Sequence, residues 1–295
     1  MMEILVTGAI MGTFYAMLAL GLSLIFGILK VVNFAHGEFF MIGAYTYAIL
    51  TRTFGVTSFL AVLPAALMGI AAGLIVERLL MRPLYQRYME WATLRDEYAV
   101  IVTFGLSLFL INLANQVFGP YQISGAGLVP LRERMQVGGV TLSTHRVLAS
   151  ILGASILLAA YLLIKYTYWG KAVQAVAQNR FGAAIAGIDS TRVSLIVFGI
   201  SGGLAAVAGA LLSPIFPAEP FAGAFPAVKS FVVVVLGGMG SLPGSIIGAY
   251  LLGILEQVGA VYVSYTYRDT FAFLVLILTL LLRPQGILGE RVREV

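Results

Sequence analysis

A short polar run, NFAHGE at residues 33–38, stands between two apolar segments of this sequence. An amide, an imidazole and a carboxylate so close together are costly to expose to lipid, and polar residues in such a setting mark functional sites. A helix interrupted at the glycine would present unpaired N–H groups and the positive end of its dipole to a cavity, which suits a carboxylate ligand. We therefore predict that Asn33, His36, Gly37 and Glu38 line or gate a pathway through the protein.

The same run also has a purely structural interpretation. Asn33 would start a helix, His36 would sit at the lipid headgroups, and Glu38 would be stabilised by the helix N-terminus. For each residue taken singly, both interpretations stay open.

A second interruption, GGMGSLPG at residues 237–244, holds four glycines and a proline. This composition cannot continue a helix between the apolar runs on either side. Two interrupted segments in the two halves of a membrane protein point to a transport pathway, so we place Gly237, Gly238 and Gly240 on it.

Glu256 is a further pathway candidate because it lies inside an apolar run, residues 244–263, where an ionisable side chain marks a functional site. Two alternatives explain it equally well. The side chain would either snorkel to the membrane surface or form an ion pair with Lys229.

Few other chemistries are available to the sequence. It has no cysteine, and its two histidines, His36 and His145, lie far apart, so we predict no metal site. It shows no Ser-His-Asp spacing and no GxxxxGK[ST] motif, so we predict that it is not an enzyme and binds no cofactor of its own. The basic residues are scattered between apolar runs, which argues against nucleic acid as a partner.

The elements that position these residues are membrane-spanning. Apolar residues make up 60% of the 295 residues and charged residues only 11%, so lipid surrounds most of the chain. We predict an all-α, polytopic membrane protein with one domain, residues 1–295, and about eight to nine transmembrane or re-entrant segments. The segments at 37–50 and 227–240 are too short to cross a bilayer at right angles. The expected segments are 4–29, 37–50, 58–77, 98–118, 146–168, 193–213, 227–240, 244–263 and 270–282.

The distribution of Lys and Arg predicts the orientation. If the loop at 169–192 is cytoplasmic and nine segments alternate, twelve basic residues lie inside and six outside, with the N-terminus outside and the C-terminus inside. The loop at 119–145 is then external, and residues 78–97 form an interfacial stretch anchored by Tyr88 and Trp91. A short segment that turned back without crossing would reverse the side of the N-terminus.

Residues 171–188, within the predicted cytoplasmic loop, have the pattern of one amphipathic helix that is too short and polar to span the membrane. Gly187 suits its C-terminal cap, and Asp189 or Ser190 suits the N-cap of the following span. Such a helix either docks on another protein or rests on lipid, and the residues alone favour neither.

Four motifs together resemble the permease family of branched-chain amino acid ABC transporters, and more closely its smaller permease subunit. They cover nearly the whole chain, and each alone is weak. The motifs are NFAHGE at 33–38 followed by MIGAY at 41–45, AVAQNR at 175–180 followed by Ala184 and AGID at 186–189, LGGMGSLPG at 236–244, and LRPQGILG at 282–289.

The resemblance implies an importer in the plasma (inner) membrane of a bacterium or archaeon. It implies a second permease subunit, two cytoplasmic ATP-binding subunits that use the ATP, and an external binding protein that delivers a branched-chain or related amino acid. It also implies ATPase contacts for a set of residues in the 169–192 loop: Gln178, Asn179, Arg180, Gly187 and Asp189.

Two rival functions remain. An ion-coupled carrier or channel would work without ATPases and would use Glu38 and Glu256 to relay protons or bind a cation. An importer of the same class would instead carry urea or short amides, and no motif selects among these substrates.

Overall fold

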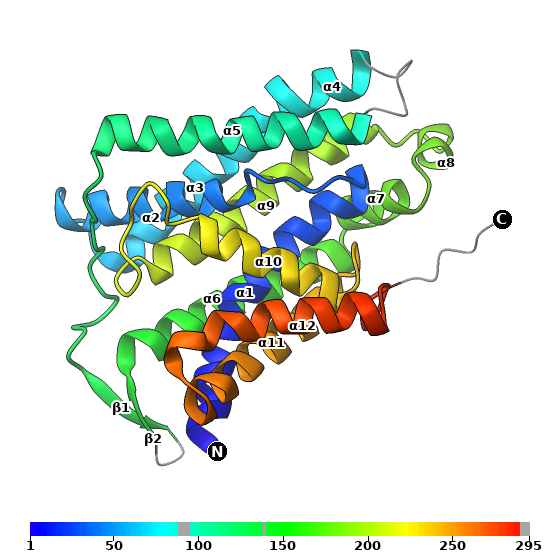
Figure 1. The fold of residues 1–295 in the computed structure, drawn as a ribbon. Coiled ribbons are helices and arrows are strands. Elements are labelled where there is room, and N and C mark those ends of the chain that lie inside the picture. Colours follow the sequence, from blue (N-terminus) through cyan, green and yellow to red (C-terminus); the bar gives the residue numbers. More distant parts are fainter. Residues whose placement is uncertain (88–94, 138–139, 290–295) are drawn as a thin grey trace.

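The computed structural model describes residues 1–87, 95–137 and 140–289 of the chain and is almost entirely helical (Figure 1). The predicted all-α class is confirmed, with one small addition. A two-stranded antiparallel ribbon, β1 (Arg134–Val137) and β2 (Val140–Ser143), interrupts the loop predicted at 119–145. The predicted anchors Tyr88 and Trp91 lie outside the described residues.

Every apolar segment expected from the sequence corresponds to a helix of the described residues. These helices are α1 (Met2–Leu29), α2 (His36–Arg52), α3 (Ser58–Val76), α5 (Arg95–Phe118), α6 (Thr144–Tyr166), α9 (Ser190–Leu212), α10 (Ala224–Gly237), α11 (Leu242–Tyr262) and α12 (Arg268–Leu282). Shorter elements connect them: a π-helical turn (Glu77–Met81), α4 (Arg82–Arg87), α7 (Tyr168–Gln178), α8 (Arg180–Ile185) and a 3-10 turn (Tyr265–Tyr267).

Seven helices of the described chain are long and apolar enough to cross a membrane. The segments predicted to be short are short: α2 has 17 residues and α10 has 14. At a rise of about 1.5 Å per residue, α10 reaches only ~21 Å, less than the ~30 Å of a hydrocarbon core. Neither helix is therefore long enough to cross a hydrocarbon core of this depth at right angles.

Helices α1 and α9 form the centre of the molecule, and most of their residues are buried. They run through the bundle with α2, α3, α10 and α11 around them (Figure 1). In contrast, α5, α6 and α12 leave most of their apolar side chains exposed, as a surface facing lipid or another subunit requires.

Glycines allow the central helices to touch through their backbones. A methyl group at Gly43 in α2 would overlap the backbone of Ala206 in α9, and one at Gly209 in α9 would overlap the carbonyl oxygen of Phe40. Small residues at such crossings permit the close packing that holds helices together in lipid.

Gly43→Val is expected to destabilise the isolated chain by about 2–3 kcal/mol, because the added side chain has no space between α2 and α9. The apparent melting temperature in detergent, followed by size-exclusion chromatography, measures the effect. Gly105→Val is the matched control, because a Cβ at Gly105 in α5 meets nothing within 4 Å. Equal melting temperatures of the two variants would contradict the packing.

The two ends of the bundle differ. At one, which we call the hairpin end, β1 and β2 lie beside the N-terminus, where the Tyr262 hydroxyl is 3.9 Å from Met1 Sδ (Figure 1). At the other, the α8 end, α7 and α8 lie on the same side as the last described residues, 283–289 (Figure 1). Met1 and the last described residues therefore lie at opposite ends of the bundle (Figure 1).

Candidate functional site

The polar run at 33–38 forms the connection between α1 and α2. Helix α1 ends at Leu29, and Lys30 adopts a left-handed conformation with φ of 59°. The Asn33 side chain then accepts a hydrogen bond of 3.0 Å from the Ala35 N–H, one residue before α2 begins. The predicted interruption is therefore present, but the N-cap of α2 is Ala35 rather than Asn33, and the Asn33 side chain stabilises the turn just before the helix.

His36 lies in the core, which corrects the interpretation that placed it at the lipid headgroups. Its side chain is almost completely buried, and Nε2 lies 3.0 Å from the Leu18 carbonyl oxygen of α1. Its Nδ1 lies 3.4 Å from the Ser201 hydroxyl of α9. The imidazole thus links α2 to both central helices.

Gly37 and Glu38 face other neighbours. A methyl group at Gly37 would overlap the Gly223 carbonyl oxygen, so the first turns of α2 and α10 meet backbone to backbone. Glu38 is buried, and its Oε1 accepts a hydrogen bond of 2.8 Å from the Ser107 hydroxyl of α5. Its Oε2 has no hydrogen-bond partner among the described residues, which leaves a costly buried acceptor.

The glycine-rich run at 237–244 is a tight turn at the α8 end. Helix α10 ends at Gly237 and α11 begins at Leu242, while Gly238 and Gly240 have φ of 104° and 84°. The last described segment closes over this turn, because the Ile287 N–H donates to the Leu236 carbonyl at 2.8 Å. The predicted interruption is confirmed. Gly238 and Gly240 adopt positive φ angles, which glycine tolerates best, and Gly237 packs against the backbone of Gly244.

Glu256 lies at the centre of a buried charge network. Lys229 in α10 contacts Glu256 Oε1 at 2.5 Å and Asp269 Oδ1 at 2.6 Å. The Tyr15 hydroxyl donates to Glu256 Oε2 at 2.8 Å, and Arg268 Nε lies 3.4 Å from the same oxygen. The predicted alternative of an ion pair with Lys229 is therefore present.

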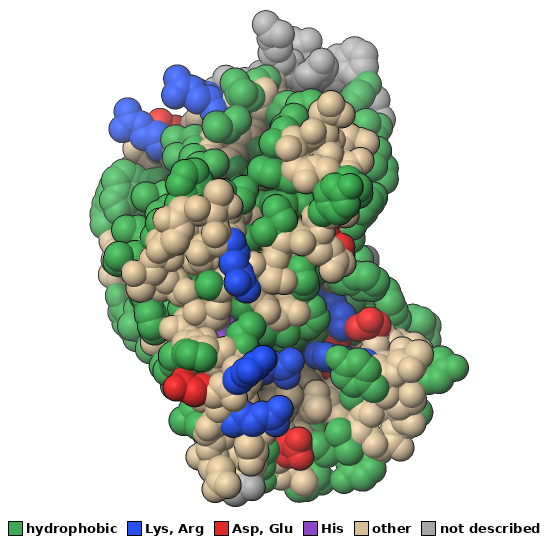
Figure 2. Space-filling model, turned by 90° about the vertical axis from the view of Figure 1, so that its left-hand side faces the viewer, with side chains coloured by type: hydrophobic (Ala, Val, Ile, Leu, Met, Phe, Trp, Pro, Cys, Tyr) green, Lys and Arg blue, Asp and Glu red, His purple; other side chains and the backbone are tan. Residues whose placement is uncertain are grey.

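This network forms one wall of a cavity of about 400 Å³ at the hairpin end. Lys229, Arg268, Asp269 and Tyr15 line it together with aromatic side chains of the connection between α9 and α10. The surface seen from the hairpin end is hollowed between its upper and lower parts (Figure 2). None of the residues predicted for the pathway lines this cavity directly, although Glu256 holds Lys229 in place.

The sequence reasoning missed Tyr15, Arg268 and Asp269. Tyr15 stands inside a long apolar run like many tyrosines that only pack, and its partner Glu256 is 241 residues away. Arg268 is one of the six basic residues predicted to lie outside, and its sequence context indicates no further role. The adjacent charges of Arg268 and Asp269 at the start of the apolar α12 are the local sequence signal that could have identified these two residues.

The predicted helix at 171–188 is two helices, which corrects the sequence interpretation. Helix α7 ends at Gln178, and Asn179 takes an extended conformation from which its side chain accepts a 2.9 Å hydrogen bond from the Gly182 N–H. Asparagine competes with the helix by such local bonds and so starts a new one. Gly187 has φ of 81°, and Asp189 caps α9, as predicted.

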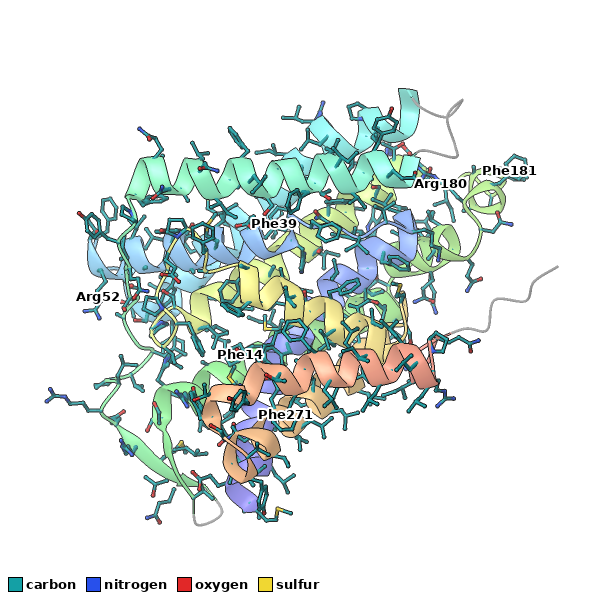
Figure 3. All side chains as sticks on the ribbon, viewed as in Figure 1. Phe14, Phe39, Arg52, Arg180, Phe181 and Phe271 are labelled. Carbon is teal, nitrogen blue, oxygen red and sulfur yellow. The ribbon has the colours of Figure 1, made fainter. Side chains whose placement is uncertain are left out.

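The exposed residues of this segment are concentrated on α8. Ala172, Val173 and Val176 of α7 are buried against the bundle, whereas Phe181 and Ile185 of α8 are 77% and 75% exposed. The Arg180 Nε donates to the Ser190 hydroxyl at 3.3 Å, which ties the base of α8 to α9. Phe181 projects away from the molecule (Figure 3). Phe181 and Ile185 are not among the residues predicted from the sequence to contact an ATPase, although both are apolar residues in a short polar segment.

A comparison with protein families decides the classification. The model described as the permease component of a branched-chain amino acid transport system matches residues 4–280. The chain belongs to this family. Together with the seven long apolar helices of the described chain, this makes it a multi-pass membrane protein.

Individual relatives agree with the family. The chain is 33% identical to the high-affinity branched-chain amino acid transport system permease protein LivH of Salmonella typhimurium, covering 96% of this chain and 94% of the relative. It is 33% identical to the corresponding protein BraD of Pseudomonas aeruginosa, covering 97% and 95%. The LivM permease of Salmonella typhimurium is 28% identical, covering 95% of this chain but only 69% of LivM. No solved structure matches the chain.

The coverage of these relatives separates the two kinds of permease. The chain accounts for nearly the full length of LivH and BraD, but for about two thirds of LivM. It therefore resembles the smaller permease, as the sequence motifs predicted.

Proposed function

We propose that this chain is a permease subunit of an ATP-driven importer for branched-chain or related amino acids in the plasma (inner) membrane of a bacterium or archaeon. The observation that carries the proposal is the similarity to LivH and BraD over nearly the full length of all three chains. The membrane path would alternate between outward-open and inward-open states as separate subunits bind and hydrolyse ATP. The chain itself would bind no cofactor and catalyse no reaction.

The surfaces that the chain leaves exposed support the proposed partners. Phe181 and Ile185 on α8 would contact a cytoplasmic ATP-binding subunit, with Gln178 and Asn179 beside them and Arg180, Gly187 and Asp189 holding the segment in shape. A second permease of the LivM kind would cover part of the apolar surface formed by α5 and α12, and lipid the rest. An external binding protein would deliver the amino acid at the hairpin end.

Purification of the assembled complex tests the proposal. The chain would be tagged and co-expressed with the permease, ATP-binding and binding-protein genes of its own organism. We expect a stable complex with one further permease and two ATP-binding subunits. Leucine uptake by the tagged chain alone in liposomes would contradict it and would favour an ion-coupled carrier or channel.

Thiol labelling tests whether Glu38 lies on the pathway, because the natural chain has no cysteine. We expect Glu38→Cys in the assembled complex to react with a water-soluble maleimide about tenfold faster in one nucleotide state than in the other. The reason is that the free oxygen of this buried carboxylate needs water or solute as a partner. Ala205→Cys, at a fully buried position of α9, is the control. An unreactive Glu38→Cys in both states would leave Glu38 only a packing role.

A further inference from the structure

The cavity at the hairpin end combines a charged wall with an apolar one. The charged wall consists of Lys229, Arg268 and Asp269, with Glu256 behind them. Aromatic residues of the connection between α9 and α10 and of the start of α10 form the apolar wall: Phe216, Phe221 and Phe225. Concave sites with apolar walls and a few converging polar groups are typical of small-molecule binding.

The charges of the wall nearly cancel. Lys229 and Arg268 supply two positive charges, and Glu256 and Asp269 supply two negative ones. Glu219 adds one negative charge at the rim, where its Oε2 accepts a hydrogen bond of 2.7 Å from Gln122. Within the network itself the four charges cancel, so a ligand with a net charge would leave one charge uncompensated there, whereas a zwitterion would not.

Arg268 has hydrogen-bond donors that no described residue accepts. Its Nε and Nη2 are buried and have no hydrogen-bond partner among the described residues, although Nε pairs electrostatically with Glu256 at 3.4 Å. Unsatisfied buried donors are costly, and a carboxylate is the partner that the guanidinium group prefers. Arg268 also lines the cavity with a side chain that is 14% exposed, so an incoming carboxylate would meet the guanidinium group there, although Nε and Nη2 themselves are covered.

Asp269 supplies the opposite charge nearby. Lys229 contacts its Oδ1 at 2.6 Å, but the side chain remains 50% exposed, so the carboxylate is still accessible from the cavity. An ammonium group would gain a charge-assisted hydrogen bond there. The two adjacent residues at the start of α12 thus present a cation and an anion to the same space.

The apolar wall is available as well. Phe221 and Phe225 are 65% and 69% exposed, and both line the cavity. An aliphatic side chain packed against them would cover apolar surface that the chain alone leaves open, which favours binding.

We propose that this cavity binds an α-amino acid with an apolar side chain in its zwitterionic form. The α-carboxylate binds at Arg268, the α-ammonium group binds at Asp269, and the side chain packs against Phe221 and Phe225. This rests on the proposed function and assigns a membrane-subunit site to the same substrate. The role of Lys229 and Glu256 is to fix Asp269 and Arg268 in position.

Ligand analogues test the site in the unaltered complex. Binding of L-leucine to the purified complex, without the binding protein, would be measured by titration calorimetry. Leucine amide lacks the carboxylate and 4-methylpentanoate lacks the ammonium group, and we expect each to bind at least about tenfold more weakly, the effect of one lost charged contact. Equal binding of all three, or no binding of leucine at millimolar concentration, would overturn the proposal.

Substitutions locate the site. We expect Asp269→Asn to weaken leucine binding about tenfold without weakening that of 4-methylpentanoate, and Phe225→Ala to weaken leucine more than alanine. Phe54→Ala is the matched control, since Phe54 is 70% exposed and does not line the cavity. Unchanged binding in both cavity variants would overturn the proposal.

The two proposals fail in different ways. If ATP-driven uptake is normal but leucine binds equally well to Asp269→Asn and Phe225→Ala, the proposed site is wrong and the proposed function stands. If leucine binds as described but uptake does not depend on ATP, the proposed function is wrong and the site stands.

Discussion

Lys229→Met is expected to destabilise the protein by about 3–5 kcal/mol, the cost of leaving a buried charge without its partner. Lys229 is the cation that separates Glu256 from Asp269, at 2.5 and 2.6 Å. Without it, Glu256, which is 0% exposed, keeps only the Tyr15 hydroxyl and the more distant Arg268. The apparent melting temperature of the detergent-solubilised chain measures the loss.

A double variant identifies the cause of this loss. Lys229→Met combined with Glu256→Gln removes both buried charges, so we expect it to recover most of the stability that the single substitution loses. Lys171→Met is the control, because Lys171 is exposed on α7 and, among the described residues, its ammonium group donates a hydrogen bond of 3.5 Å to Gln174. If the double variant were less stable than Lys229→Met alone, the ion pair would not be the reason.

Replacing both Phe181 and Ile185 with alanine is expected to lower ATP-driven uptake at least about tenfold while the fold persists. These side chains are 77% and 75% exposed on a short helix, so their loss costs the isolated chain little. Apolar anchors at the centre of an interface carry most of its binding energy, at roughly 1–2 kcal/mol or more for each truncation. Uptake, and ATP hydrolysis stimulated by loaded binding protein, would both be measured in the assembled complex.

Two further variants distinguish the contacts made by Phe181 and Ile185 from the conformation of α8. Gly182→Pro removes the N–H that Asn179 caps, so we expect the same loss of coupling although both apolar side chains remain. Leu281→Ala, at a 74% exposed position of α12, is expected to leave coupling intact. Normal stimulation in the double alanine variant would show that α8 does not transmit the ATPase signal.

The sequence predicted the helices well because lipid imposes a simple rule. Each span needs an apolar run, and the breaks at 33–38 and 237–244 contain residues that end helices for local reasons. The N-cap at Asp189 and the positive φ of Gly187 were predictable on the same local grounds. Such features depend on neighbours within a few residues along the chain.

The cavity was not predictable, because its residues come from distant parts of the chain. Tyr15 and Glu256 are 241 positions apart, and Lys229 and Asp269 are 40 apart. Nothing near Glu256 in the sequence shows which of several cations it contacts. The orientation of the His36 imidazole toward the core likewise depends on Ser201 of α9, which is 165 residues away in the sequence. The break at Asn179 was missed because the alanine-rich run around it favours a continuous helix.

The most direct test of the importer function is leucine uptake into liposomes that contain the purified complex, with loaded binding protein outside and ATP inside. We predict uptake that requires ATP in the lumen and persists when a protonophore collapses the proton gradient. The same liposomes without the ATP-binding subunits are expected to accumulate no leucine. Accumulation without those subunits, or its abolition by the protonophore while ATP is present, would contradict an ATP-driven permease.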